Sequence, residues 1–430
     1  MAAPGRNGNG NPLLKLAAES ANAPELRECV QFFSREKQWI NETHLKLCRI
    51  PAATFFEQKR AEWMQEQFAA LGCEASIDRG GNVVAFLGKR GDRELIAVTA
   101  HLDTVLAPRN PEAEITFGGG DGRFHGPGVS DNGAGLTALL ALAKAMRTCP
   151  ESMLSDRDSD RPAIAFVANV GEEGEGNLGG MRYLCRQSPL ADRLAAFVVL
   201  DGPGTDHITC QALASRRFDV TVSGPGGHSW SDYGMGNPVH ALSRAIALFA
   251  DTRVNANGGP RSSFNFGILE GGLSINSIPT SARTKVDIRS ESAQKLDEMS
   301  ALLTSCVERA VEIENDRATG GRVSARVRDI GTRPGGRLAE DAPILNVLRA
   351  VDAHLGIRAQ VDCASTDANI PLWLGLQAVS IGAGGQGGGA HTPSEWYSAE
   401  GRELGLKRIL LALTLLLQTI PQPLSAGTAE

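Results

Sequence analysis

Several apolar or glycine-rich stretches of this 430-residue chain carry a histidine or a carboxylate at or just beyond their ends. These side chains are His101 and Asp103 after LIAVTA, Asp131 within GPGVSDNGAG, Glu172 and Glu173 after AIAFVANVG, Asp201 after AFVVL, and His391 after LQAVSIGAGGQGGGA. Imidazoles and carboxylates suit divalent zinc, and the set is large enough for two zinc ions that each keep an open position. The pattern therefore predicts a two-metal hydrolytic site.

Each of these side chains has a simpler interpretation when it is taken alone. Asp131 could cap the helix that follows it, and Asp201 could belong to a turn. Glu172 and Glu173 could lie in a solvated loop, and His391 could be a surface histidine. The hypothesis of a metal site depends on the regularity with which strand after strand ends in a possible ligand.

The chemistry assigns roles within the set. One carboxylate must bridge two metals about 3.5–4 Å apart, and Asp131 suits this because its glycine-flanked loop allows close approach. Asp103 shares one face of an extended segment with His101, so it can hydrogen-bond the imidazole nitrogen that does not bind metal. Of Glu172 and Glu173, one can bind metal while the other accepts a proton from water.

The apolar runs that carry these residues alternate with helical segments such as residues 56–72 and 135–146. This alternation predicts an α/β fold with a mostly parallel sheet and helices on both of its faces. Ligands in such folds bind beyond the carboxyl ends of the strands. The expected sheet would therefore gather the candidate side chains at one edge.

The pattern changes near Arg216, where the order strand, helix, strand, strand, helix, strand predicts a small α+β domain with a mostly antiparallel sheet. We expect this domain to cover residues 216–330 and to be inserted into a catalytic domain formed by residues 26–215 and 331–421. Residues 1–25 are rich in Gly, Asn and Ala, and we expect them to be disordered.

The composition excludes several classes of partner. A formal net charge of −6 gives no attraction for nucleic acid or an anionic membrane. The longest apolar run, residues 409–417, is too short to span a bilayer. The eight cysteines are scattered without a Cys-x-x-Cys pair, and no secretory signal is evident, so we expect free thiols and a cytoplasmic location.

The motifs AHLDTV, GVSDNGAG, GEEGEGNLGG, LDG and AHTPSEW resemble the five metal motifs of a family of di-zinc metallopeptidases. That family includes peptidase T, glutamate carboxypeptidase, carnosinase-type dipeptidases, acetylornithine deacetylase and succinyl-diaminopimelate desuccinylase, and the resemblance covers about residues 30–420. It implies a zinc exopeptidase-like fold with two Zn²⁺ per chain, for which Co²⁺ or Mn²⁺ could substitute. The implied ligands are His101, Asp131 and Asp201 for one zinc, and Asp131, Glu173 and His391 for the other.

The resemblance also implies roles for residues that do not bind metal. Glu172 would be the general base and later the acid, and Asp103 would orient the metal-binding histidine. The inserted domain would be a lid that pairs two chains into a homodimer, and its GPGGHSW motif would place His228 to polarise the scissile carbonyl. Asn276 and Arg289 resemble residues that bind a substrate carboxylate, which a guanidinium can hold with two parallel hydrogen bonds.

Within the family, Asp201 and the stretch GEEGEGNLGGMRYL resemble the aminopeptidases most. They favour the hydrolysis of peptide bonds in small peptides, as in a di- or tripeptide aminopeptidase. An N-acyl amino acid deacylase or a glutamate-type carboxypeptidase is the alternative within the family. The stretch Ser365–Asp367 resembles a further family motif with Ser in place of Gly, and its role stays open.

Three classes of protein outside this family fit the sequence less well. Residues 174–179 fit the G-x-G-x-x-G pattern of an NAD-binding oxidoreductase, but Glu172, Glu173 and Glu175 would repel a pyrophosphate more strongly than a helix N-terminus could attract it. No G-x-S-x-G motif supports a serine hydrolase. A binding protein without catalytic activity is disfavoured because every expected metal and catalytic position is filled.

Overall fold

The computed structural model describes residues 12–87, 93–118, 121–148, 162–252 and 259–420. The chain divides into two compact units, of which the first comprises Met1–Gln211 and Arg337–Glu430 and the second comprises Ala212–Gly336. The second unit is thus inserted into the first, with limits a few residues outside the expected 216–330. Residues 151–162 are rich in Asp, Ser and Arg, which indicates a polar loop, but most of this stretch lies outside the described residues.

The first unit is built on a nine-stranded sheet in the order β1-β2-β6-β3-β7-β17-β8-β15, with β16 paired to β8. Its strands are β1 (Glu74–Ile77), β2 (Val83–Phe86), β3 (Leu95–His101), β6 (Ala163–Asn169), β7 (Leu194–Leu200), β8 (His207–Ala212), β15 (Gly336–Arg337), β16 (Gln360–Ala364) and β17 (Gln377–Ile381). The four central strands β6, β3, β7 and β17 are parallel to one another. The residues of β3 are all buried, as the unbroken apolar run requires for a strand covered on both faces.

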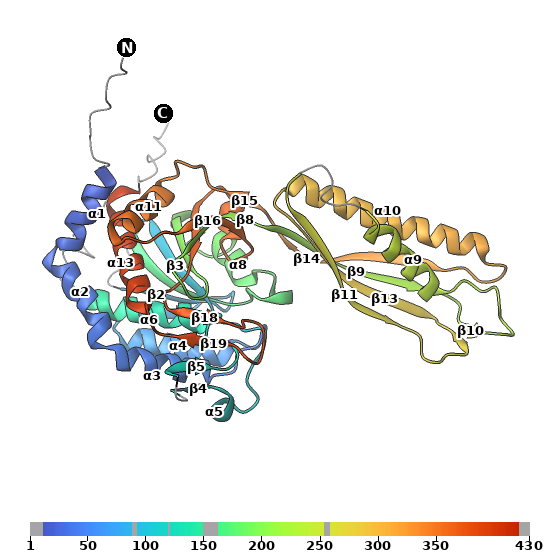
Figure 1. Ribbon diagram of the computed structural model, residues 1–430, viewed down its shortest axis with the longest axis horizontal. Coiled ribbons are helices and arrows are strands. Elements are labelled where there is room, and N and C mark those ends of the chain that lie inside the picture. The colour runs from blue at the N-terminus through green and yellow to red at the C-terminus, as the bar shows by residue number, and fades with distance from the viewer. Residues whose placement is uncertain (1–11, 88–92, 119–120, 149–161, 253–258, 421–430) are drawn as a thin grey trace, which may run out of the picture. The chain divides into compact units, whose positions relative to one another are not determined.

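Helices cover this sheet and complete the predicted α/β architecture (Figure 1). The α-helices described in this unit are α1 (Pro12–Asn22), α2 (Pro24–Arg35), α3 (Lys37–Cys48), α4 (Gln58–Ala70), α5 (Pro111–Glu114), α6 (Gly133–Arg147), α8 (Gly179–Arg186), α11 (Pro343–Leu355), α12 (Asn369–Trp373) and α13 (Arg402–Thr419). Helix α6 is buried along nearly its whole length, because its small residues let it pack closely against β3 and β6. The fold class predicted from the sequence, a mostly parallel core with helices, is confirmed.

The expectation that residues 1–25 are disordered is wrong for the part that the structure describes. Residues 12–22 form α1, and α2 begins at Pro24. Helix α1 packs against α11 and α13, and the side chain of Ala17 is completely buried. Figure 1 shows these N-terminal helices in blue beside the red α13. The tertiary partner lies almost 400 residues away in the sequence, so composition alone did not reveal it.

A second, smaller sheet of the first unit lies in the order β18-β19-β5-β4. Its strands are β4 (Thr116–Phe117), β5 (Arg123–His125), β18 (Gln386–Gly388) and β19 (Trp396–Ser398). Antiparallel pairing of β19 with β5 joins the AHTPSEW motif to the segment that precedes GPGVSDNGAG. Two motifs more than 260 residues apart are thereby brought together.

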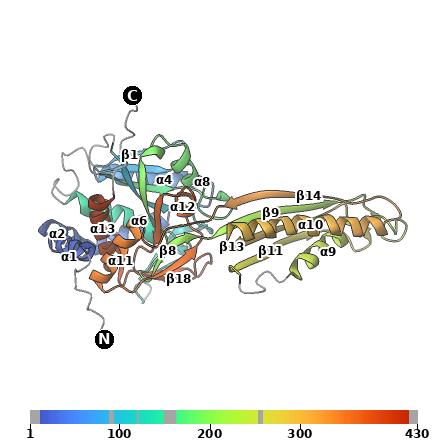
Figure 2. The same ribbon diagram turned by 90° about the horizontal axis from the view of Figure 1, so that it is seen from above.

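The second unit is a four-stranded sheet in the order β11-β13-β9-β14 with two helices on one face. Its elements are β9 (Ala214–Ser223), β10 (Gly227–His228), α9 (Pro238–Ala250), β11 (Ser262–Gly271), β12 (Ser277–Ile278), β13 (Ser281–Ser290), α10 (Ala293–Arg317) and β14 (Ser324–Arg333). All three strand pairs are antiparallel, as the sequence predicts. Figure 2 shows α10 extended along the sheet.

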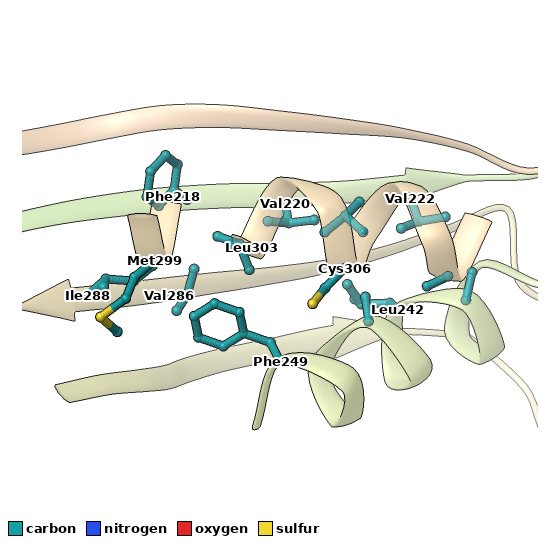
Figure 3. Packing of buried hydrophobic residues seen from close by; sticks show 14 of the residues in the cluster. Phe218, Val220, Val222, Leu242, Phe249, Val286, Ile288, Met299, Leu303 and Cys306 are labelled. Atoms are coloured by element: carbon teal, nitrogen blue, oxygen red, sulfur yellow. The ribbon is translucent and has the colours of Figure 1, made fainter. Parts of the chain in front are cut away.

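The core of the second unit lies between this sheet and its helices. Figure 3 shows Phe249 of α9 and Leu303 of α10 packed toward Val220 of β9 and Val286 of β13. On the opposite face of the sheet, Asp219 alternates with these buried residues, as the period of two in a strand requires. The buried residues of this core all belong to the second unit.

Two further expectations concern the cysteines and the membrane. Cys48, Cys73, Cys185, Cys210 and Cys306 are buried free thiols. Cys29, however, is disulfide-bonded, so the expectation of free thiols is wrong at that position. Pairing of distant cysteines depends on the fold and not on local spacing. Within the described ranges, no helix combines the length and apolar character needed to cross a membrane.

Candidate metal centre

Three adjacent parallel strands deliver most of the predicted side chains to one edge of the sheet. His101 is the last residue of β3 and pairs with Asn169, the last residue of β6. Glu172 and Glu173 follow β6 by a few residues, and Asp201 directly follows β7. The carboxyl ends of parallel strands lie at the same edge, which is why residues from three separate stretches meet there.

Asp131 lies between the two histidines. Its Oδ1 atom is 3.0 Å from Nε2 of His101, and its Oδ2 atom is 3.1 Å from Nε2 of His391. The same His391 nitrogen is 2.8 Å from Oε1 of Glu173, and Nε2 of His101 is 3.9 Å from Oδ1 of Asp201. One carboxylate thus faces two imidazoles through its two separate oxygens, which is the arrangement expected of a bridging ligand.

The candidate ligand atoms form overlapping groups in which all atoms lie within 4.8 Å of one another. The groups are His101, Asp131 and Asp201; Asp131, Glu173 and His391; and His101, Glu172 and Glu173. The first two groups coincide with the two ligand sets implied by the family resemblance and share Asp131. In the third group, Glu172 lies beside both sets.

The loop that presents Asp131 is fixed by Glu395 of the AHTPSEW motif. The buried Glu395 carboxylate accepts backbone N–H groups from Gly128 at 2.7 Å, Ser130 at 2.7 Å and Asp131 at 2.8 Å. Three charge-assisted hydrogen bonds to neighbouring residues of one loop leave it little freedom. Glu395 was not among the predicted site residues, although an acidic side chain inside the AHTPSEW motif was a usable signal.

The helix cap that Asp131 could have provided is provided by its neighbour. Oδ1 of Asn132 accepts the backbone N–H of Gly135 at 3.1 Å, and the same amide donates to the carbonyl of Leu200 at 2.8 Å. Asn132 therefore caps α6 and ties it to the end of β7. Gly133 is needed here because a Cβ would lie 2.6 Å from the Gly128 carbonyl oxygen. Asp131 is left to face the histidines.

Asp103 differs in detail from its expected role. Nδ1 of His101 lies 2.9 Å from the carbonyl oxygen of Asp103 and 3.5 Å from its carboxylate. The carboxylate itself accepts the backbone N–H groups of Glu172 at 3.0 Å and Glu173 at 2.9 Å, and the hydroxyl of Thr54 at 2.9 Å. Asp103 thus orients the imidazole mainly through its backbone, while its side chain holds the loop that carries both glutamates.

The electrostatics of the site reflect a crowd of buried carboxylates. Burial, and then the neighbouring Glu172, raises the pKa of Glu173 to about 7. Burial and the Asp131 carboxylate raise the pKa of Asp201 well above its usual range. The hydrogen bond to Asp131 raises the pKa of His391 to about 9. Burial opposes ionisation of Asp131, yet its hydrogen bonds to the two histidines hold its pKa well below the ordinary value.

These residues fit a pair of divalent cations. Four carboxylates and two imidazoles converge at a site where His391 is exposed and the other five side chains are buried or partly buried. Two imidazoles cannot neutralise that much negative charge. Oxygen and nitrogen donors in this ratio match zinc, cobalt or manganese more closely than a soft thiophilic metal. Mutual repulsion of the carboxylates would be relieved by bound cations.

A further acidic residue, unassigned by the sequence, lies in the same region. Asp367 belongs to the Ser365–Asp367 stretch and is buried, and its Oδ2 atom accepts the Asn169 side-chain amide at 2.6 Å. Burial, and then the Glu172 carboxylate, raises the pKa of Asp367 to about 7. Among the described residues, neither Oδ1 of Asp367 nor Oδ1 of Asn169 has a hydrogen-bond partner.

The three predicted substrate-binding residues belong to the second unit, where two of them are close together. His228 pairs with Ser277 across β10 and β12, and the carbonyl of Asn276 accepts the backbone N–H of Ser229 at 3.0 Å. Arg289 lies near the opposite end of β13, where its Nε donates to Asp287 at 2.6 Å. Thus, this unit brings His228 and Asn276 together but separates them from Arg289.

Comparison with known proteins agrees with this geometry. Residues 97–415 match the family model described as peptidase family M20/M25/M40. The chain belongs to this family. The match includes residues of both parts of the first unit and the whole inserted unit, so the family assignment does not depend on one motif.

Two known relatives share limited sequence identity with this M20/M25/M40 chain. The alkaline phosphatase isozyme conversion protein of Escherichia coli is 27% identical over 34% of this chain and 47% of its own length. A succinyl-diaminopimelate desuccinylase of Psychrobacter is 22% identical over 49% of this chain and 54% of its own length. The matched region spans about half the length of each of these relatives.

Solved structures match over almost the whole length. A tripeptidase of Staphylococcus aureus has a TM-score of 0.71 at 19% identity, covering 89% of this chain and 98% of its own. The aminopeptidase PepT of Bacillus cereus has a TM-score of 0.67 at 19% identity, covering 87% and 97%. A protein of Bacillus subtilis described as a dinuclear metal-binding peptidase of family M20 has a TM-score of 0.62 at 16% identity, covering 91% and 99%. These likenesses establish a shared fold.

Proposed function

We propose that this protein is a metal-dependent peptidase that hydrolyses amide bonds in small peptides, as a di- or tripeptide aminopeptidase. The observation that carries the proposal is the position of Asp131, whose two oxygens face His101 at 3.0 Å and His391 at 3.1 Å. A carboxylate shared between two ligand groups is what a two-metal hydrolytic centre requires.

In this proposal one cation would be held by His101, Asp131 and Asp201, and the other by Asp131, Glu173 and His391. A bound pair of divalent cations supplies Lewis acidity, which polarises a carbonyl and lowers the pKa of water toward about 7. The description of the Bacillus subtilis relative as a dinuclear metal-binding peptidase supports two cations, and zinc is our proposal for their identity. Cobalt or manganese would suit the same donors.

Glu172 acts as the general base. Its backbone N–H is held by Asp103 at 3.0 Å, and its side chain groups with His101 and Glu173. In the hydrolysis, Glu172 takes a proton from the attacking water as the carbon–oxygen bond forms. It then gives that proton to the leaving amine nitrogen as the carbon–nitrogen bond breaks, so the carboxylate is regenerated.

His228 stabilises the negative charge that develops on the carbonyl oxygen. Its Nδ1 atom accepts the backbone N–H groups of Trp230 at 3.2 Å and Ser231 at 3.3 Å. A nitrogen that accepts two hydrogen bonds carries no proton, so the neutral imidazole carries its proton on Nε2. The exposed ring can therefore donate Nε2–H to an oxyanion, and loss of one such donor typically costs about 10²–10³ in turnover.

Arg289 of one chain and Asn276 of a second chain bind the substrate carboxylate, and the position of Arg289 supports this homodimer. From Ser281 to Arg289, β13 spans eight residue steps at about 3.3 Å each, or about 26 Å. The ladder continues from Ser281 toward β10, so His228 lies beyond that end (Figure 1). A small peptide cannot reach both Arg289 and His228 of one chain, so a second chain would supply one of these two residues.

The names of relatives favour peptides over other amides. The Staphylococcus aureus protein is a tripeptidase and the Bacillus cereus protein is an aminopeptidase, which supports small peptides as substrates. The Psychrobacter relative is a desuccinylase, and this observation favours N-acyl amino acid deacylation as the second candidate. A glutamate-type carboxypeptidase uses the same chemistry and is included in the test.

The test is metal analysis combined with a substrate panel. We expect the purified protein to bind two equivalents of zinc and to cleave free di- or tripeptides, but not N-terminally blocked ones, in a chelator-sensitive manner. Preferential cleavage of N-acyl amino acids would establish the deacylase instead. Failure to bind divalent cations at all would refute the metal centre, whatever the substrate.

A further inference from the structure

An exposed apolar patch borders the candidate metal centre. It consists of Phe55, Phe56, Val105 and Leu106, whose exposed fractions are 66%, 75%, 43% and 37%. These residues come from two segments that lie side by side, because Ala53 forms a parallel bridge with Thr104. We refer to these four residues as the apolar rim.

The apolar rim is joined to the centre through direct contacts. Thr54, which precedes Phe55, donates its hydroxyl to the Asp103 carboxylate at 2.9 Å. That carboxylate holds the backbone of Glu172 at 3.0 Å. Val105 and Leu106 follow Asp103 by two and three residues. Phe55 and Phe56 are therefore within two positions of Thr54, which bonds Asp103. Val105 and Leu106 are within three positions of Asp103 itself, whose carboxylate holds the general base loop.

The backbone of Phe55 is strained, and packing of its side chain does not offset this strain. Its φ is +74°, in the left-handed region that favours glycine and is strained for a bulky residue. Leu178 also has a positive φ, but its side chain is completely buried, so packing offsets the strain there. The Phe55 ring is mostly exposed and gains little from packing. Glycine would suit this position better for stability alone.

Strain that is kept without a packing gain indicates a role in binding a ligand. Water-exposed aromatic rings beside a polar centre offer an apolar surface that complements an apolar side chain. We propose that the apolar rim, with Phe55 at its centre, binds a bulky apolar side chain of the peptide and makes the enzyme selective for such peptides. This inference rests on the proposed peptidase activity and adds the substrate class to it.

The test compares kcat/KM for Phe-Ala, Ala-Phe, Leu-Ala, Ala-Ala and Asp-Ala in the full-length metal-loaded protein. We expect the wild type to prefer at least one peptide with Phe or Leu over Ala-Ala by about tenfold or more, the range typical of apolar pockets. Phe55→Gly should reduce that ratio to near one. It should not lower the melting temperature, because glycine accepts the backbone conformation without strain.

A matched control and a second variant keep the outcomes distinct. Leu14→Ser changes a similarly exposed leucine, 39% exposed, on α1 and should keep the wild-type ratio. Phe56→Ser should lower the ratio as Phe55→Gly does. Cleavage of peptides with no apolar preference, or a preference that survives both phenylalanine variants, overturns the inference and leaves the peptidase proposal standing. Cleavage of none of the peptides refutes the proposed function and this inference with it.

Discussion

Oδ1 of Asp103 accepts the backbone N–H of Glu172 at 3.0 Å. The aspartate follows β3 and the glutamate follows β6, and the bond locks the ends of two neighbouring parallel strands to each other. Asp103 is completely buried, and burial alone would favour its neutral form. Hydrogen bonds and the charge of His101 nevertheless lower its pKa, so the residue stays an anion that can hold the loop.

This contact predicts the effect of Asp103→Asn. An amide side chain would present one NH₂ group toward the backbone N–H groups of Glu172 and Glu173, and two donors cannot bond each other. We expect kcat to fall by about 10²-fold or more, since misplacement of a catalytic group by about 1 Å has that effect. Steady-state kinetics measure it. Unchanged kcat in a variant that binds metal normally would contradict the positioning role.

Glu172→Gln tests the general base. The side chain keeps its size, but glutamine cannot accept the proton of the attacking water. We expect retention of both metal equivalents, unchanged substrate KM and a loss of kcat of about 10³-fold, within the range for general base catalysis. Metal content by elemental analysis is measured on the same preparation. Glu175→Gln, in the same loop, serves as the matched control; wild-type turnover in Glu172→Gln would assign the base elsewhere.

Glu395→Gln tests the loop that carries Asp131. The three backbone N–H groups bonded to Glu395 would meet an NH₂ group in place of one oxygen, so the loop should lose its fixed position. Loss of such a supporting partner typically weakens metal binding by about 10–100-fold. Competition with a chelator measures the affinity. The exposed Glu400→Gln is the control, and equal affinities in both variants would show that Glu395 is dispensable.

Mixing two inactive variants tests the shared site. If His228 serves the centre of the partner chain, a heterodimer of His228→Ala and Glu172→Gln contains one complete site. Random exchange makes about half of the dimers mixed, so about a quarter of wild-type activity should return. The measurement is activity against mixing time under conditions that allow subunit exchange. Activity that never exceeds the sum of the separate variants would argue that each chain uses its own His228.

Asp219 in the second unit predicts how stability depends on pH. Hydrogen bonds from Arg283 at 2.9 and 2.6 Å and from Arg328 at 2.9 Å lower its pKa to about 2. Because the folded pKa lies below the unfolded value, the stabilisation is complete above about pH 5 and is lost as the pH falls toward 2. The partly exposed arginines limit it to about 1–2 kcal/mol.

Asp219→Asn should therefore lower the free energy of unfolding at pH 6 by that amount and make little difference at pH 2. Calorimetric melting temperatures of both proteins across this range give the comparison. The control Asp297→Asn removes a carboxylate whose side chain is 75% exposed and lies 3.5 Å from Arg216, so it should change little at any pH. A constant gap between wild type and Asp219→Asn down to pH 2 would contradict the assigned pKa.

Much of the fold could be predicted from local patterns in the sequence. The apolar runs of β3, β6 and β7 and the small-residue helix α6 could be read directly, because buried parallel strands and close-packed helices leave strong signatures in sequence. The inserted unit was equally clear from the change of period. Residues 12–22 were misjudged because α1 is marginal by itself and gains its stability from α11 and α13.

The sequence by itself determined which side chains could hold metal, since His101, Asp131, Glu173, Asp201 and His391 are marked by residue type and by their place at or just beyond the ends of apolar or glycine-rich stretches. Only the tertiary structure decided how they are held. Glu395 bonds the Asp131 loop from more than 260 residues away, and Asp103 turns its carboxylate to a loop about 70 residues away. Residue type decides whether a side chain can bind metal. The contacts that hold these side chains in place join distant segments, and no local sequence pattern indicates them.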